Sequence, residues 1–257
     1  MQKRIAMVGC MDSRLNLFFE ELRDSLIEKN PGAPVYIIRD AGGGINAVEK
    51  TLLGLGVNEI HDYTHTNCGA MKVALSACAK IRSGSKLDEV ESSRDVYKSI
   101  IAPLANETYQ TPLEIEWRHT MLQSEALSHL MTAHPEFETS CELIDINKIN
   151  VPKSEKEHML IIGMAYDGKY TDITKKWNLE LQGTYFVQAD YIEEVKPAVR
   201  LAVERLNIHN AMFVSNAESE HSIVDKWSND SEFRQMFEKH LMKVPVISQK
   251  EKHMKPK

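Results

Sequence analysis

The chain has 257 residues, of which 42% are hydrophobic and 26% are charged, and its formal net charge is −6 at pH 7. This composition is ordinary for a globular protein, and the length suffices for one large domain or two smaller ones. The negative net charge and the scattered lysines and arginines argue against nucleic acid as a partner. Because no stretch approaches the roughly 20 apolar residues that span a bilayer, we expect no membrane association either.

The N-terminal residues and the cysteines indicate the compartment. The apolar run Ile5–Gly9 is too short for a secretory signal peptide, and it leads straight into Asp12 and Arg14. The sequence contains four cysteines, namely Cys10, Cys68, Cys78 and Cys141. They are too few and too scattered for a disulfide scaffold, so we expect a reducing, cytoplasmic setting.

The first part of the chain alternates short apolar runs with helical stretches. The predicted elements, in chain order, are a strand over 3–9, a helix over 15–29, a strand over 35–38, a helix over 46–55 and a strand over 59–63. Strands that alternate with helices indicate a parallel sheet, and such sheets bind ligands at the carboxyl ends of their strands.

The middle of the chain, residues 80–157, carries no chemical motif that identifies a function. Its charged stretch over 86–105 predicts a surface helix. The alternation of apolar residues over 112–117 predicts a strand, and the amphipathic stretch over 119–133 predicts a second helix.

From Met159 onward the opening pattern returns. Met159–Met164 resembles Ile5–Cys10, Thr184–Val187 resembles Val35–Ile38, and a third apolar run follows over 211–216. In this register Cys10, His65 and Cys68 are replaced by Met164, Asn216 and Ser219. We therefore predict an α/β fold with a zinc-binding half over residues 1–157 and a degenerate second half, without metal ligands, over 158–257. The alternative is that the two segments share only their strand–helix periodicity.

Three candidate metal ligands lie at the predicted strand ends. Cys10 directly follows the first strand, and His65 and Cys68 follow the third. Two thiols and one imidazole fill three corners of a zinc tetrahedron, and an open fourth corner is typical of a catalytic zinc. Because His65 and Cys68 are three residues apart, one turn can direct both at a single ion. The alternative for each isolated cysteine is a small buried hydrophobe. We predict a Zn²⁺ cofactor held by these three residues.

The remaining candidates receive structural interpretations. Cys78 and Cys141 fit no ligand spacing, and we expect the other nine histidines to be surface or packing residues: His61, His119, His129, His134, His158, His209, His221, His240 and His253. The glycine run Gly42–Gly44 lacks the lysine of a phosphate-binding loop. We expect it to allow a close backbone approach to the metal site, with Gly42 and Gly43 lining a substrate pocket.

Three motifs at successive strand ends resemble those of the β-class carbonic anhydrases over about residues 3–75. They are Cys10-x-Asp12-x-Arg14, Arg39-x-Ala41-Gly42 and His65-Thr66-x-Cys68-Gly69. The resemblance implies a zinc-dependent lyase that hydrates carbon dioxide reversibly to bicarbonate. It implies zinc on the three ligands above, with water or hydroxide in the fourth position.

The resemblance also implies roles for Asp12 and Arg14 as the catalytic pair of the family. An ionised Asp12 accepts the hydrogen bond of the zinc-bound hydroxide and aims it at carbon dioxide. Arg14 holds Asp12 in place and lowers its pKa. In some members of the family the same carboxylate moves onto the zinc. Family members also pair their subunits, and here a degenerate second half, or a homodimer, can play that part.

The sequence departs from the family pattern at several places. Asp40 stands where asparagine is common, Thr64 stands where glycine usually precedes the histidine, and the first strand begins too early for the long N-terminal arm. Met159–Asp167 also resembles the fourth-strand signature of the family, which competes with the repeat. Two alternative functions therefore stay open: a related zinc hydrolase of carbonyl sulfide or carbon disulfide, and a catalytically weak zinc-binding interaction protein.

Overall fold

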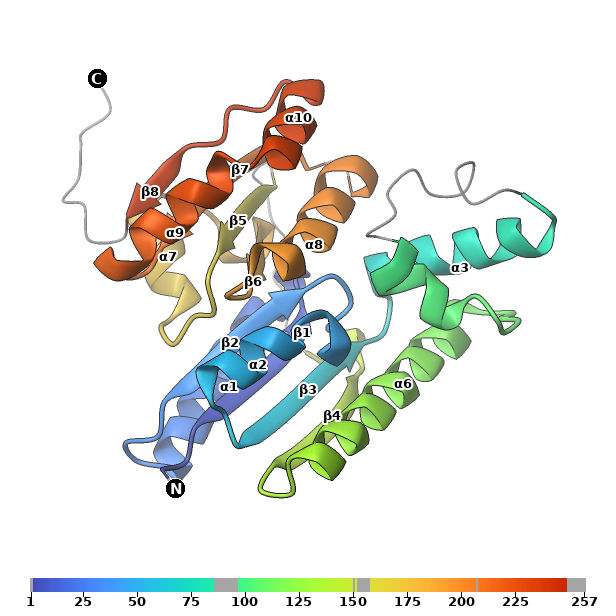
Figure 1. The fold of residues 1–257 in the computed structure, drawn as a ribbon, viewed down its shortest axis with the longest axis horizontal. Helices are drawn as coiled ribbons and strands as arrows, with labels where there is room; N and C mark the ends of the chain where they lie inside the picture. The colour runs from blue at the N-terminus through green and yellow to red at the C-terminus, as the bar shows by residue number, and fades with distance from the viewer. Residues whose placement is uncertain (1, 86–96, 150, 152–157, 207, 249–257) are drawn as a thin grey trace.

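Strands from the whole chain join into one mixed sheet in the computed structural model, which describes residues 2–85, 97–149, 151, 158–206 and 208–248. The order across the sheet is β4-β3-β1-β2-β6-β5-β7-β8 (Figure 1). The strands are β1 (Ile5–Cys10), β2 (Val35–Asp40), β3 (Glu59–His65), β4 (Glu138–Ile144), β5 (Met159–Gly163), β6 (Thr184–Gln188), β7 (Asn210–Ser215) and β8 (Val246–Ser248).

Helices connect and cover these strands. The α-helices are α1 (Asn16–Lys29), α2 (Glu49–Leu55), α3 (Gly69–Arg82), α6 (Pro112–Ala133), α7 (Tyr170–Lys176), α8 (Ile192–Arg205), α9 (Glu218–Ser228) and α10 (Ser231–Lys239). Single turns of other helix types are η1 (Ser13–Leu15), η2 (Ile45–Ala47), η3 (Tyr97–Ile101), η4 (Ala102–Leu104), η5 (Ile146–Lys148) and η6 (Leu181–Gly183). No helix in the described residues is long and apolar enough to cross a membrane.

The α/β class predicted from the alternating pattern is confirmed. All six residues of β1 are buried, as is typical of a strand covered on both faces. The sheet differs from the prediction at one place, because β2 and β6 meet in antiparallel orientation at the pair Arg39–Gln188. The other neighbouring strands of the described sheet run parallel.

The prediction of a strand over 112–117 is wrong, because this segment is the first part of α6. The side chain of Thr111 accepts a hydrogen bond from the backbone N–H of Glu114, and Pro112 follows this cap as the first helical residue. The expected helix over 86–105 lies in part outside the described residues, and its remainder forms η3 and η4.

The strand order is symmetric about the β2–β6 pair. Gly9 of β1 pairs with Arg39 and Tyr63, and Gly163 of β5 pairs with Gln188 and Val214. Gly9 and Gly163 therefore hold matched positions in the two halves. The residues that follow them, Cys10 and Met164, correspond to each other. Strand order and register have the arrangement that the predicted repeat requires; duplication itself, and the division at residue 157, stay predictions.

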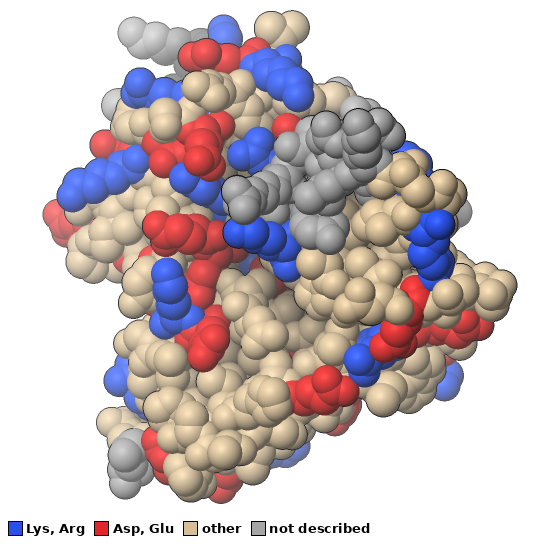
Figure 2. Space-filling view, turned by 45° about the vertical axis from the view of Figure 1, so that its right-hand side comes forward, with Lys and Arg blue, Asp and Glu red and all other residues tan. Residues whose placement is uncertain are grey.

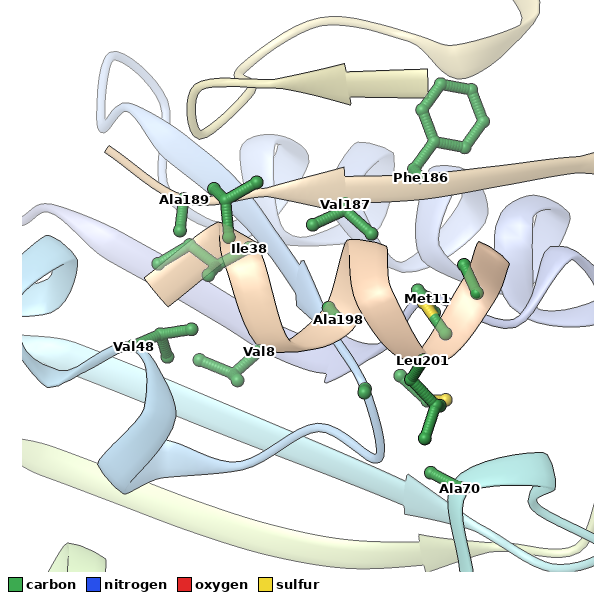
Figure 3. Close-up of a cluster of buried hydrophobic side chains, with 14 of the residues drawn as sticks. Val8, Met11, Ile38, Val48, Ala70, Phe186, Val187, Ala189, Ala198 and Leu201 are labelled. Carbon is green, nitrogen blue, oxygen red and sulfur yellow. The ribbon is translucent and has the colours of Figure 1, made fainter. Parts of the chain in front are cut away.

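The hydrophobic core is continuous across the junction of the two halves. Figure 3 shows Val8 and Ile38 of the first half beside Val187 and Ala198 of the second, with α8 lying over the junction. Ile38, Val8 and Val187 are fully buried. The two halves therefore share apolar surface instead of each burying its own.

Buried polar contacts also cross the junction in both directions. Glu20 of α1 accepts hydrogen bonds from the backbone N–H and hydroxyl of Thr171, at the start of α7. In return, Glu194 of α8 accepts from the backbone N–H groups of Lys50 and Thr51, at the start of α2. Carboxylates at helix starts satisfy free N–H groups and complement the helix dipole.

Charged residues of both signs are interspersed on the face of the molecule that Figure 2 shows. Blue and red side chains lie close together there and frame a tan, uncharged hollow. This face presents no continuous basic surface among its described residues.

Candidate metal centre

Two strand ends and one helix start bring the three predicted ligands together. Cys10 is the last residue of β1, His65 is the last residue of β3, and Cys68 directly precedes α3. Their ligand atoms all lie within 4.8 Å of one another, and all three residues are buried. In the described part of the chain this is the one group of three or more histidine, cysteine or acidic residues with such spacing. It is a potential metal site.

The spacing and donor chemistry of the group fit Zn²⁺. Two Zn–S bonds of about 2.3 Å at the tetrahedral angle place their sulfurs about 3.8 Å apart. The Sγ atoms of Cys10 and Cys68 are 3.8 Å apart. The Nδ1 atom of His65 lies 2.9 Å from the carbonyl oxygen of Thr66, to which it donates when Nε2 carries the lone pair. Nε2 is buried and has no hydrogen-bond partner among the described residues. Such an atom is poised to coordinate a metal.

The two thiols influence each other's ionisation. A hydrogen bond from Cys68 lowers the pKa of Cys10 well below its usual value, against the effect of burial, and the nearby His65 adds to the lowering. The same contact, together with burial, raises the pKa of Cys68. Cys10 is therefore the thiol that ionises first. A cysteine has to be ionised to act as a metal ligand.

Asp12 and Arg14 form a tight pair beside the three ligands. The guanidinium donates through Nε to Oδ1 of Asp12 at 2.9 Å and through Nη2 to Oδ2 at 2.6 Å. Burial raises the pKa of Asp12, but the hydrogen bonds from Arg14 and the charges of His65 and Arg14 together outweigh it, so the pKa lies below its usual value. Oδ2 lies 3.9 Å from Nε2 of His65. An ionised carboxylate is therefore held at the edge of the ligand cluster.

Arg39, the first residue of the second motif, holds the turn after β1. It is completely buried, its planar guanidinium lies over the ring of Phe19, and it donates to the carbonyl oxygens of Cys10 and Asp12 at 2.6 and 2.8 Å. These bonds fix the backbone on both sides of Met11. By fixing the backbone of Cys10, they also fix the direction in which its side chain leaves the strand.

The glycine run packs against this same backbone. Gly43 has a φ of 76°, and a Cβ there would lie 3.0 Å from both the backbone nitrogen of Cys10 and the Cα atom of Gly9. Gly42 also has a positive φ, of 91°. Asp40 closes the loop by accepting from the backbone N–H of Gly44 at 2.9 Å. The run therefore allows the close backbone approach that a side chain would prevent.

A cavity of about 240 Å³ lies beside the ligand cluster. Cys10, Asp12 and Arg14 line it from the first half, and Tyr185 and Leu206 line it from the second half. Gly42 and Gly43 are not part of the lining of this cavity: Gly43 lies against the backbone of Cys10, and Gly42 lies beside Met71 and His119. Of the three predicted ligands, Cys10 lines this cavity together with the Asp12–Arg14 pair, and His65 and Cys68 lie behind the lining.

The middle region supplies contacts that the sequence did not reveal. The buried face of α6 carries polar residues at positions 116, 119, 120 and 123, a helical spacing. Glu116 accepts from the backbone N–H of Cys68 at 3.0 Å, and His119 bonds to the carbonyl oxygen of Gly42 at 3.0 Å. Burial raises the pKa of Glu116 and lowers that of His119. In the sequence these residues are visible only as polar side chains at helical spacing, a pattern that is equally typical of the exposed face of a helix.

The other cysteines lie apart from the cluster. Cys78 is buried in α3, and Cys141 on β4 donates to Asp62 at 3.4 Å. Neither belongs to the group of ligand atoms described above.

The sequence matches no protein-family model and no curated protein. Several solved structures are similar. A carbonic anhydrase from Glaciozyma antarctica is 20% identical, with 57% of this chain and 79% of that chain covered and a TM-score of 0.35. The β-carbonic anhydrase isoform I from Trichomonas vaginalis is 20% identical, with 59% and 81% covered and a TM-score of 0.36. A tetrameric β-carbonic anhydrase from Sordaria macrospora is 21% identical, with 57% and 78% covered and a TM-score of 0.34.

Proposed function

We propose that this chain is a zinc-dependent, carbonic anhydrase-like lyase that catalyses the reversible hydration of carbon dioxide to bicarbonate and a proton. The observation that carries the proposal is the convergence of Cys10, His65 and Cys68 beside a cavity that also receives an arginine-paired carboxylate. Metal ligands alone would suit a structural zinc; the cavity and the carboxylate favour a catalytic one.

Zn²⁺ held by the two thiolates and the imidazole would supply a Lewis acid, which makes water a nucleophile near neutral pH. The remaining work falls to residues of this chain. Asp12, kept ionised by Arg14, offers only acceptor oxygens, so it takes a hydrogen bond from the nucleophile and orients it. Arg14 keeps that carboxylate at the edge of the cluster.

The cavity offers surroundings suited to a small apolar substrate and an anionic product. Tyr185 and Leu206 provide apolar surface, whereas Arg14 and Lys72 bring positive charge to the lining. Because Tyr185 and Leu206 come from the second half, we propose that this half plays within one chain the part that a partner subunit plays in the β-class family. One active site per chain follows from this arrangement.

Rapid-mixing measurements of carbon dioxide hydration, made on a sample whose zinc content is measured in parallel, test the proposal. Hydration that requires zinc and rises with pH supports it. Zinc-loaded protein that shows no hydration between pH 6 and 9 contradicts it. The same sample given carbonyl sulfide or carbon disulfide then distinguishes a related hydrolase from a zinc-binding interaction protein.

A further inference from the structure

The peptide unit between Asn67 and Cys68 is held at both of its polar ends. Its carbonyl oxygen, on Asn67, accepts from Nη2 of Arg14 at 2.9 Å. Its N–H, on Cys68, donates to Oε1 of Glu116 at 3.0 Å. The same Nη2 of Arg14 donates to Asp12. A continuous path of hydrogen bonds therefore leads from Glu116 through a single peptide plane and Arg14 to the Asp12 carboxylate.

This peptide unit lies in a turn that needs support. Asn67 has a φ of 58°, the left-handed region, which a residue other than glycine adopts at an energetic cost. The turn has to place His65 and Cys68 on either side of it within reach of one ion. A buried acceptor for the N–H of Cys68 fixes the orientation of the peptide plane, and therefore also the position of the Cα–Cβ bond of Cys68.

Glu116 reaches this turn from a distant part of the chain. It lies on α6, 48 residues after Cys68, and is only 2% exposed. Figure 1 shows α6 along the outer edge of the sheet, beside β3 and β4. A neighbouring contact ties the same helix face to β3, where the hydroxyls of Thr64 and Thr120 lie 2.6 Å apart. The carboxylate is thus anchored by a helix that is itself bonded to the strand carrying His65.

We propose that Glu116 is a positioning residue of the metal centre. Through the Asn67–Cys68 peptide it sets the place of the Cys68 ligand and, through Arg14, the orientation of Asp12. The part that concerns Asp12 rests on the proposed function, whereas the part that concerns Cys68 requires only that the cluster binds a metal. Groups that hold metal ligands in this indirect way typically change metal affinity by roughly 10- to 100-fold when they are removed.

The experiment is a titration of the metal-free protein with Co²⁺, followed by absorption spectroscopy. Cobalt reports its sulfur ligands and its geometry directly, without any turnover. We compare the wild type with Glu116→Ala, which removes the acceptor, and with Glu116→Gln, which keeps an acceptor oxygen on a side chain of the same length. We expect Glu116→Ala to bind Co²⁺ roughly 10- to 100-fold more weakly and with an altered spectrum. We expect Glu116→Gln to restore most of the affinity.

Glu20→Ala is the matched control. Glu20 is also a buried glutamate that accepts a backbone N–H at a helix start, but its partner is Thr171. We expect it to lower stability without changing the cobalt affinity or spectrum. Affinity and spectrum of Glu116→Ala equal to those of the wild type would overturn the proposal. So would a Glu20→Ala protein that loses as much affinity, or a Glu116→Gln protein as weak as Glu116→Ala.

Activity measured on the same zinc-loaded variants separates this proposal from the function itself. A wild type that binds Co²⁺ as a sulfur-ligated ion but hydrates no carbon dioxide contradicts the proposed function and leaves the cobalt result for Glu116 standing. If the wild type is active, Glu116→Ala should lower the turnover rate of metal-saturated protein more than it changes the substrate concentration at half-maximal rate, because Asp12 loses its orientation.

Discussion

The two halves of the sheet share a framework and differ at the ends of their strands. β1 pairs with β2 and β3 in the register in which β5 pairs with β6 and β7. At the matched ends the first half has Cys10 and His65, and the second half has Met164 and Asn216. The framework depends on buried apolar positions that many residues can fill, whereas the chemistry depends on a few end residues.

The turns after the third strand of each half illustrate this difference. In the second half Glu220, inside α9, accepts from the backbone N–H groups of Asn216 and Ala217, so the turn is capped locally. In the first half the corresponding turn contains a candidate metal ligand, and its acceptor is Glu116 on a distant helix. In this chain the turn that carries a candidate ligand is therefore capped by a residue distant in the sequence, and the matched turn without a ligand is capped by the helix that follows it.

The largest expected difference between the halves is metal binding itself. We expect one zinc per chain, bound through the first half, and we expect Cys68→Ser to lose it. Ser219→Ala, at the matched position of the second half, should retain the metal, because that half has no cluster of ligands among its described residues. Elemental analysis of the purified proteins measures both. Two zinc ions per chain, or unchanged zinc in Cys68→Ser, would contradict this assignment.

The second expected difference concerns the residue three positions after each of the two matched strand glycines, which is Asp12 after Gly9 and Tyr166 after Gly163. Asp12→Ala should keep the metal and lose hydration activity by about 10²–10³, the usual effect of removing one oriented hydrogen bond at a reacting centre. Arg14→Ala should cause a similar loss, because it releases Asp12. Tyr166→Phe serves as the control and should leave the rate unchanged.

The outcome that would refute this mechanism is a zinc-containing Asp12→Ala protein as fast as the wild type. Zinc has to be measured in every variant, because Asp12 lies only 3.9 Å from Nε2 of His65 and a loss of zinc would also abolish activity. We expect the three ligands to stay in place when Asp12 is replaced.

The strand ends were predictable from the sequence because short apolar runs identify buried strands and parallel strands present their ends together. The position of α6 was not. Leu113, Ile115 and Trp117 alternate as in a strand, and only the Thr111–Pro112 cap reveals the helix. The role of Glu116 was not predictable either, because its partner is 48 residues away. The antiparallel β2–β6 contact also depends on tertiary packing, which local patterns do not encode.

A third difference lies in the interior of the third strands, where Asp62 of β3 matches Phe213 of β7. Asp62 is fully buried, receives a hydrogen bond from Cys141, and burial raises its pKa to about 8. The unfolded carboxyl ionises near pH 4, so between pH 4 and 8 the unfolded state binds fewer protons than the folded state. The free energy of unfolding should therefore fall as pH rises through this window, by about 1 kcal/mol per pH unit.

Urea unfolding of the wild type and of Asp62→Asn between pH 5 and 7 measures this effect. The amide does not ionise, so the variant should lack this contribution to the pH dependence. Equal slopes of unfolding free energy against pH in the two proteins would show that Asp62 is already ionised in the folded state.

The smallest expected effect tests whether the two halves are separable. Glu194 of the second half is buried and accepts from the backbone N–H groups of Lys50 and Thr51 in the first. Glu194→Ala leaves these donors without their carboxylate and should lower the free energy of unfolding by about 1–3 kcal/mol. Glu193→Ala, on the exposed neighbouring position, should change it by less than about 0.5 kcal/mol.

Because the sheet and core are continuous across the junction, we expect the wild type and both variants to unfold in one transition. Fluorescence reports chiefly on the second half and the middle region, where Trp117, Trp177 and Trp227 lie, whereas far-ultraviolet circular dichroism reports on the whole chain. Coincident curves from the two probes indicate a single cooperative unit. Two separated transitions in Glu194→Ala would mean that each half is stable alone and that the contacts of Glu194 couple the unfolding of the two halves.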